Sequence, residues 1–211
     1  MRKINPTIIL VRPQLPENIG MTARVMDNFG LSKLYIVNPR DGWPSKIAEN
    51  SAKHGKNIIK KVKNFTSLNE AVSKFNLVIA TTNRKRFLTK KTYSNFFDLK
   101  EKIINFKNTA ILFGPENSGL SNQDLRLTNY IFTIKTASLN KSLNLSHAVS
   151  VISYELFNSK KVNSNFTENY ELANKYEFSN FMNVLIKDLD SKSFFNPLEK
   201  KESMIDNIYS I

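Results

Sequence analysis

The segment Ala110–Phe157 reads AILFGPENSGLSNQDLRLTNYIFTIKTASLNKSLNLSHAVSVISYELF and determines the fold class of the chain. It contains two apolar runs, Ala110–Phe113 and Tyr130–Ile134, whose lengths are typical of strands buried in a sheet. Each run leads directly into a loop of small and amide residues. Because open α/β sheets bind ligands at the carboxyl ends of their strands, these two loops are the predicted ligand site.

The two loops offer different polar groups. The first, Gly114–Gly119, has two glycines and the carboxylate of Glu116. The second, Ala137–Asn144, holds serine and asparagine side chains and leads into an apolar helix predicted over Leu143–Phe157. The segment contains neither a pair of charged catalytic residues nor a metal-binding cluster, and no glycine-rich dinucleotide or P-loop fingerprint follows any predicted strand. We therefore expect a cofactor that is held largely by backbone groups.

The rest of the chain alternates predicted strands and helices up to about residue 158. Further strands are expected at Thr7–Val11, Leu34–Val37, Ile58–Val62 (as an edge strand) and Leu77–Thr81. Further helices are expected at Pro16–Phe29, Ser45–Gly55, Ser67–Phe75, Asp98–Phe106, Glu168–Asp190 and Pro197–Tyr209, with a short one capped by Ser121. This pattern predicts an α/β domain with a mostly parallel sheet over residues 1–158 and a helical extension over residues 159–211.

Composition narrows the class of protein. Lysine and arginine number 31 against 18 acidic residues, which gives a formal net charge of +13. Such a charge fits a polyanionic partner such as nucleic acid, although a general bias toward lysine and asparagine also accounts for part of it. The absence of cysteine excludes disulfides, thiolate metal sites and cysteine nucleophiles. Because the N-terminal apolar run Ile8–Val11 is too short for a signal-peptide core or a membrane span, we expect a soluble cytoplasmic protein.

Several polar residues each fit two interpretations. Arg24, in the first helix, either packs its stem while its charge reaches water or aims its guanidinium at a phosphate or ribose. Asn18 fits the start of the same helix and, less directly, a site residue. The run Ser142–Asn144 fits an N-cap and also a ligand-binding helix mouth, and both can hold together. His147 is expected to be a packed or capping residue, not a catalytic one.

Three segments, LVRPQLPENIGMTAR, LFGPENSGL and SLNLSHAVSVISYEL, follow one another along the chain in that order. Together they resemble the three motifs of the SPOUT-superfamily ribose 2′-O-methyltransferases of the TrmH kind, over Thr7–Phe157. The resemblance implies an α/β fold with a trefoil knot in its carboxyl-terminal part, S-adenosylmethionine as methyl donor, and a homodimer with its sites at the subunit interface. Knots are rare exceptions among folds, and no periodicity in a sequence predicts one.

The resemblance also implies roles by position. The matched catalytic residues are Asn18, Arg24, Glu116, Ser142 and Asn144. The methyl donor is expected against Thr81, Thr82, Asn83, Gly114, Ile134, Ser142, Leu143 and Asn144. We expect Arg24 to clamp an RNA phosphate or ribose oxygen, because a guanidinium that stays protonated is a poor general base. Glu116 is expected to organise the two loops, and Asn18 to orient Arg24 or the target ribose.

Within the superfamily the chain is similar to the TrmJ-type enzymes, which methylate the 2′-oxygen of nucleotide 32 in the tRNA anticodon loop. This similarity implies tRNA as the substrate. The alternatives are the same chemistry on rRNA or at another tRNA position, and a non-catalytic RNA-binding factor with the same fold. The basic segment Arg84–Lys91, which begins with Arg84, Lys85 and Arg86, is either a surface for the tRNA backbone or a solvated loop.

Overall fold

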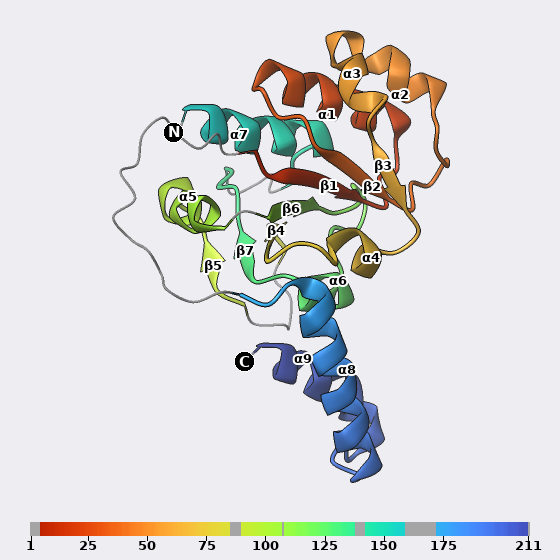
Figure 1. Cartoon of the computed structure of the whole chain (residues 1–211), viewed down its shortest axis with the longest axis vertical. Coiled ribbons are helices and arrows are strands. Elements are labelled where there is room, and N and C mark those ends of the chain that lie inside the picture. The colour runs from red at the N-terminus through yellow and green to blue at the C-terminus, as the bar shows by residue number, and fades with distance from the viewer. Residues whose placement is uncertain (1–4, 85–89, 107, 138–141, 159–171, 211) are drawn as a thin grey trace.

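The computed structural model in Figure 1 describes residues 5–84, 90–106, 108–137, 142–158 and 172–210. Its strands are β1 (Thr7–Val11), β2 (Leu34–Val37), β3 (Lys63–Phe65), β4 (Leu77–Thr81), β5 (Thr92–Tyr93), β6 (Thr109–Phe113) and β7 (Tyr130–Phe132). Its α-helices are α1 (Pro16–Asn28), α2 (Lys46–Ser51), α3 (Lys56–Ile59), α4 (Leu68–Val72), α5 (Phe96–Asn105), α6 (Asn122–Arg126), α7 (Leu145–Asn158), α8 (Lys175–Ser191) and α9 (Lys201–Ser210). Two 3₁₀ turns, η1 (Lys53–Gly55) and η2 (Leu198–Lys200), precede α3 and α9.

The strands form one seven-stranded sheet in the order β3-β2-β1-β6-β4-β7-β5. Every neighbouring pair in this order runs parallel. The expected α/β class with a parallel sheet is therefore confirmed. Because β4 lies between β6 and β7 and the strands are parallel, the loops that follow these three strands meet at the carboxyl-terminal end of the sheet.

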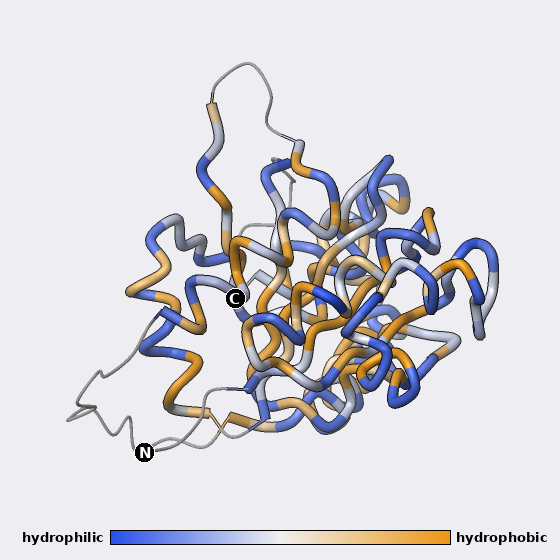
Figure 2. The backbone as a smooth tube through the Cα atoms, turned by 90° about the horizontal axis from the view of Figure 1, so that it is seen from above, coloured by the Kyte–Doolittle hydropathy of each residue, from blue (hydrophilic) through white to orange (hydrophobic). Residues whose placement is uncertain are grey.

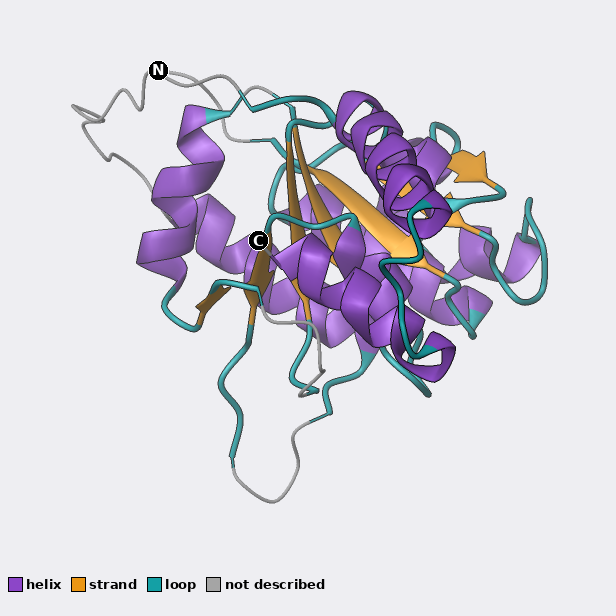
Figure 3. Cartoon of the chain, turned by 90° about the horizontal axis from the view of Figure 1, so that it is seen from below, coloured by secondary structure: helices purple, strands orange, loops and turns teal. Residues whose placement is uncertain are grey.

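Helices cover both faces of the sheet, as Figure 3 shows from below. Alternate residues of β1 divide between the two faces, with Ile8 and Leu10 in one apolar cluster and Ile9 and Val11 in the other. Helices α1, α2, α3, α5 and α7 supply the first cluster, and α4 and α6 supply the second. In Figure 2 hydrophobic residues accordingly concentrate in the interior of the domain, and many of the outer turns are hydrophilic.

The strands Thr7–Val11, Leu34–Val37 and Leu77–Thr81 have the predicted bounds, but the edge of the sheet differs from expectation. The prediction of an edge strand over Ile58–Val62 is wrong, because Ile58 and Ile59 pack as part of a helical turn against the first apolar cluster. Their spacing to Val62 fits one side of a helix as well as a strand. The edge strand is β3, which pairs with β2 and consists mainly of exposed residues.

The predicted helix starts are largely confirmed, since Ser45, Ser67 and Ser121 each accept a backbone hydrogen bond at the start of a helix. The helix that begins after Ser45 ends at Ser51, earlier than predicted, and a 3₁₀ turn then carries the chain into α3. The last strand of the domain also ends at Phe132, two residues before its predicted end.

The C-terminal helices make two contacts with the side of the domain that holds the second apolar cluster, one beside α4 and one at α6. Helix α8 begins at Lys175, later than predicted, and Asn174 and Glu177 cap it reciprocally. The first two amides of α8 donate to the carbonyls of Phe75 and Ser73 beside α4, at 3.0 and 3.1 Å. Residues 159–171, at the start of the predicted helical extension, lie outside the described residues.

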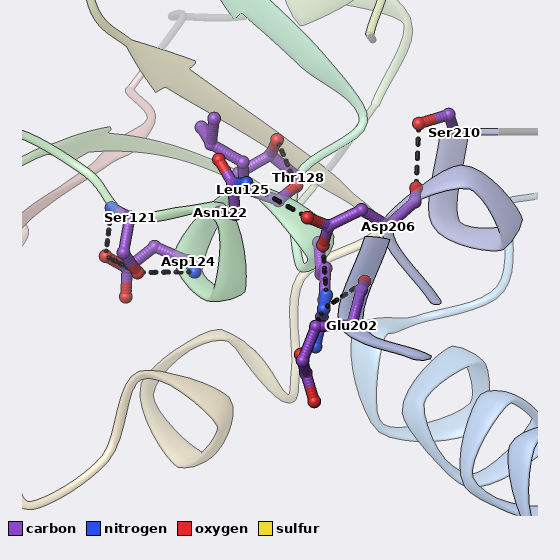
Figure 4. Close-up of polar contacts among 9 residues, drawn as sticks. Ser121, Asn122, Asp124, Leu125, Thr128, Glu202, Asp206 and Ser210 are labelled. Atoms are coloured by element: carbon purple, nitrogen blue, oxygen red, sulfur yellow. Dashed lines mark hydrogen bonds and ion pairs between the residues drawn. The ribbon is translucent and has the colours of Figure 1, made fainter. Parts of the chain in front are cut away.

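The second contact joins α9 to α6 through charged groups (Figure 4). Arg126 donates from Nε to Asp206 at 2.7 Å and pairs with Glu202 at 2.8 Å. Asn122 donates to the other oxygen of Asp206 at 2.9 Å. Figure 1 shows α8 and α9 projecting together from the sheet, and the rings of Phe178 and Tyr209 lie 5.9 Å apart between them.

No helix within the described part of the chain is both long and apolar enough to cross a membrane.

Candidate active site

A cavity of about 310 Å³ opens at the carboxyl ends of the central strands. Its wall combines the ends of β4 and β6, the loop after β7 and the start of α7. The lining residues are Thr81, Thr82, Asn83, Arg84, Phe113, Gly114, Pro115, Glu116, Gly119, Ile134, Ser142, Leu143, Leu145 and Ala148. The cavity is therefore formed by the two polar loops that the sequence predicts, together with the loop after β4.

The loop after β6 folds tightly on itself because it contains glycine at two positions. A Cβ atom on Gly114 would lie 2.4 Å from the backbone nitrogen of Leu120, closer than side-chain carbons approach other atoms. Gly119 has a φ of +66°, in the left-handed region that favours glycine, and its amide donates to Pro115 at 2.8 Å. The turn presents Glu116 at the rim of the cavity.

Glu116 joins the first helix to this loop. One carboxylate oxygen accepts the side-chain amide of Asn18 at 2.6 Å, and the other accepts the backbone amide of Gln14 at 2.8 Å. Asn18 is 1% exposed, so its amide would be costly to bury without such a partner. The carboxylate therefore ties the start of α1 to the loop after β6.

Asn144 extends this network to α7. Its amide nitrogen donates to the Asn18 carbonyl oxygen at 3.1 Å. Its own oxygen accepts from the backbone amide and the hydroxyl of Ser146, at 2.9 and 2.8 Å, so Asn144 caps α7. The network Glu116–Asn18–Asn144 thus connects three segments of the protein. Asn18 lies 98 residues from Glu116 and 126 residues from Asn144 in the sequence.

The end of β4 is held by its own threonines. The Thr81 hydroxyl donates to the Leu112 carbonyl at 2.6 Å, and the Thr82 carbonyl accepts the Thr133 hydroxyl at 2.9 Å. Arg84 donates to the Asn117 carbonyl at 2.6 Å, which places its guanidinium along the loop after β6. These bonds fix the three strand ends relative to one another around the cavity.

An ion pair that sequence reasoning missed supports the same loop from the outside. Arg12, which has a φ of 49° directly after β1, pairs with Asp124 through its two terminal guanidinium nitrogens, Nη1 and Nη2. Asp124 also accepts from the backbone and hydroxyl of Ser121, both at 2.8 Å. Its position within a capping box after the loop was the available signal, but its partner lies 112 residues away.

The structure brings together most of the residues that the sequence predicts for the site. All residues predicted to contact the methyl donor, except Asn144, line the cavity. Asn144 is linked to the lining residue Glu116 through Asn18. Arg24 stands apart, exposed on α1, and Asn18 bonds to Glu116 and Asn144 and not to Arg24. Lys85 and Arg86 lie outside the described residues. The packed interpretation of His147 is wrong, because its side chain is exposed on the first turn of α7.

The lining residues that sequence reasoning missed are Phe113, Leu145 and Ala148, and it gave Pro115 and Gly119 no contact of their own within the predicted loop. They are apolar or glycine, so their residue types do not distinguish them from ordinary core and turn positions. Among the described residues no group of three or more histidine, aspartate or glutamate side chains is placed to hold a metal ion.

Comparison with known proteins agrees with this geometry. Residues 5–154, which include every part of the Glu116–Asn18–Asn144 network, match the model of the SpoU rRNA Methylase family. The chain belongs to this family. The family match ends near the end of α7, so α8 and α9 lie beyond it.

Similar proteins include tRNA methyltransferases. The tRNA (cytidine-2′-O-)-methyltransferase TrmJ of Methanocaldococcus jannaschii is 35% identical over 171 residues, which cover 77% of this chain and 71% of the relative. The crystal structure of TrmJ from Z. mobilis ZM4 is 35% identical, with a TM-score of 0.88 over 97% of this chain and 88% of that one. The SpoU methyltransferase AviRb of Streptomyces viridochromogenes, solved in complex with AdoMet, shares the fold at 22% identity, with a TM-score of 0.59 over 76% of this chain and 62% of that one.

Proposed function

We propose that this protein transfers a methyl group from S-adenosylmethionine to a ribose 2′-hydroxyl of tRNA, at nucleotide 32 of the anticodon loop. The observation that carries the proposal is the Glu116–Asn18–Asn144 network beside the cavity, since it assembles the three motif segments into one site. TrmJ relatives at 35% identity, named as tRNA 2′-O-methyltransferases, support the reaction and the substrate class.

The cavity fits S-adenosylmethionine in size and in the chemistry of its lining. Its volume of about 310 Å³ falls within the range of small-molecule pockets, which begins at about 300 Å³. Phe113, Ile134 and Leu145 offer an apolar wall for an adenine ring, and Thr82, Asn83 and Ser142 among others offer polar groups for the ribose and amino-acid portions. When bound, S-adenosylmethionine would supply an activated methyl group, so the protein has mainly to align the ribose and stabilise its developing alkoxide.

Arg24 is the residue we assign to the ribose or its phosphate. A guanidinium presents several donors in a fixed plane and can hold two oxygens at once. Arg24 is exposed on α1 and outside the lining of its own cavity. Glu116 accepts hydrogen bonds from Gln14 and Asn18, and we assign it a positioning role, with the proton of the 2′-hydroxyl passing to a phosphate or to water.

A second copy of the chain would bring an Arg24 side chain close to the cavity. Helices α1 and α7 carry large apolar side chains that stay exposed, namely Met21, Val151, Tyr154 and Phe157. Clustered exposed apolar groups mark association surfaces. We propose a homodimer through this face, in which Arg24 of one subunit reaches the cavity of the other. We also propose that the segment around α7 forms the family's trefoil knot. The chain would divide near residue 158 into an α/β domain and a helical extension. We further propose a cytoplasmic location, where tRNA is available.

The first test is methyl transfer from labelled S-adenosylmethionine to bulk tRNA, followed by mapping of the modified nucleotide. We expect a 2′-O-methyl group at position 32. Label at another tRNA position or in rRNA only would retain the chemistry and replace the substrate. Donor binding without transfer to either RNA would favour a non-catalytic RNA-binding factor, and absence of both would overturn the proposal.

Two variants of Arg24 test its role. Arg24→Lys keeps the charge and loses the planar pair of donors, whereas Arg24→Gln loses both. For a bidentate clamp we expect kcat to fall at least tenfold in both variants while donor binding stays unchanged. Near-normal turnover of Arg24→Lys would show that only the charge matters.

A further inference from the structure

The stretch 53–63, KHGKNIIKKVK, carries an uncommon concentration of positive charge. It holds five lysines and no acidic residue. Its buried residues, Gly55, Ile58 and Ile59, face the core, while all five lysine side chains are exposed. We define the lysine face as Lys53, Lys56, Lys60 and Lys61, because Lys63 lies over the ring of Tyr35, which packs against the second apolar cluster on the other face of the sheet.

The lysine face has little internal compensation. Within the described ranges none of its four lysines forms an ion pair. The neighbouring carboxylate, Glu49, already pairs with Lys46 at 2.8 Å. That hydrogen bond is the main cause that lowers the pKa of Glu49, and attraction to Lys56 and Lys60 lowers it further, so these two lysines lie on the same side of the molecule.

The lysine face lies beside Arg24. A Cβ atom on Gly55 would lie 2.6 Å from the carbonyl oxygen of Ala23 and 2.7 Å from the backbone nitrogen of Arg24, so the η1 backbone rests directly on that turn of α1. Figure 1 shows α1, α2 and α3 grouped on one face of the sheet. The segment that carries the lysines is therefore anchored next to the residue assigned to the target ribose.

We propose that the lysine face binds the sugar–phosphate backbone of the substrate RNA next to the nucleotide that Arg24 contacts. This inference rests on the proposed function. Like charges that crowd without counter-ions repel one another, and a polyanion relieves that repulsion while releasing its own condensed cations. Lysine ammonium groups on flexible stems contact phosphates without reading bases, so the lysine face contributes to affinity and orientation, not to the choice of base or to the chemical step.

The test compares two double variants with the same change in charge. Lys56→Gln/Lys60→Gln removes two members of the lysine face. Lys33→Gln/Lys74→Gln removes two exposed lysines that precede β2 and β4. They lie at the amino-terminal ends of the strands, and the cavity lies at the carboxyl ends. Dissociation constants for tRNA are measured between 0.05 and 0.3 M monovalent salt, together with kcat, KM for tRNA and the dissociation constant for S-adenosylmethionine.

We expect the Lys56/Lys60 variant to bind tRNA roughly 10- to 50-fold more weakly at 0.1 M salt, with a salt slope smaller by about 1.4 to 1.8 than that of the natural protein. Its KM for tRNA should rise in proportion, while kcat at saturating tRNA and donor binding stay within twofold. The Lys33/Lys74 variant should keep the natural salt slope.

Three results would overturn the inference. Equal losses in both double variants would show a general effect of net charge, and an unchanged slope in the Lys56/Lys60 variant would exclude the contact. A fall in kcat with KM unchanged would place these lysines in the chemistry instead. If the natural protein methylates tRNA while one of these results appears, only the lysine face is rejected. If the natural protein neither binds nor methylates tRNA, the proposed function and the inference fail together.

Discussion

Lys175 opens helix α8 with its side chain almost fully buried, at 3% exposure. Burial, with a smaller contribution from the nearby charge of Lys90, lowers its pKa to about 7. Burial also lowers the pKa of Lys90, to about 8. The Lys175 ammonium lies 4.7 Å from the ring centroid of Phe178, and among the described residues no carboxylate pairs with it. We predict that replacing Lys175 with methionine, which keeps the apolar stem and removes the charge, stabilises the protein at neutral pH.

The pH dependence of this effect follows from proton binding. An unfolded lysine has a pKa of about 10.4, so between pH 7 and pH 10 the unfolded chain binds more protons at this site than the native protein does. Stability of the natural protein therefore rises with pH across that window. With a native pKa of about 7, the unfavourable contribution of Lys175 is at most about 4 kcal/mol at pH 7 and about 2 kcal/mol at pH 9.

Urea unfolding at pH 7 and pH 9 measures this contribution, with Lys187→Met, an exposed position on the same helix, as the control. Lys175→Met should gain up to about 4 kcal/mol at pH 7 and about 2 kcal/mol less at pH 9, whereas the control should show no dependence on pH. A gain of equal size at both pH values would refute the role of charge burial. Destabilisation at both would show that the ammonium makes a necessary contact.

Three further predictions concern the site and its support. Glu116→Gln keeps one acceptor oxygen and puts an NH2 donor opposite either the Asn18 side-chain amide or the Gln14 backbone amide, so we expect kcat for methyl transfer to fall at least tenfold, consistent with about 1.5–3 kcal/mol for a hydrogen bond to a charged group. Gly114→Ala should abolish donor binding in calorimetry, because the added carbon would lie 2.4 Å from the Leu120 amide nitrogen; unchanged affinity would show that the loop can relax. Arg126→Gln should release α9 from α6 and raise amide hydrogen exchange in α9 more than in the sheet, while exchange that stays slow would mean that apolar packing alone holds the helix.

Much of the fold was predictable because each central strand is a continuous run of β-branched, aliphatic and aromatic residues. The strands Thr7–Val11, Leu34–Val37 and Leu77–Thr81 carry their signal locally, and serine caps mark several helix starts. The edge strands were not predictable on these grounds. β3 and β5 are short and partly exposed, and they exist because a neighbouring strand offers free backbone groups to pair with.

The site was predictable where loop chemistry follows a strand directly. Glu116 and Ser142 stand in such loops, and both line the cavity. Arg24 shows the limit of this reasoning. Its position in the first motif matches a catalytic arginine, yet its side chain lies outside the cavity of its own chain, because six residues of helix carry it away from the strand end where Asn18 lies.

The order of residues along the chain by itself determined the α/β class, the central strands and the two polar loops, because apolar periodicity and turn chemistry act over a few neighbouring residues. Only the tertiary structure decided that Asn18 bonds to Glu116 and Asn144, and that Arg12 pairs with Asp124. Such bonds join residues about a hundred positions apart, and they form because the parallel sheet brings the carboxyl ends of β1 and β6 side by side. Local sequence cannot encode that proximity, which arises from the pairing of strands.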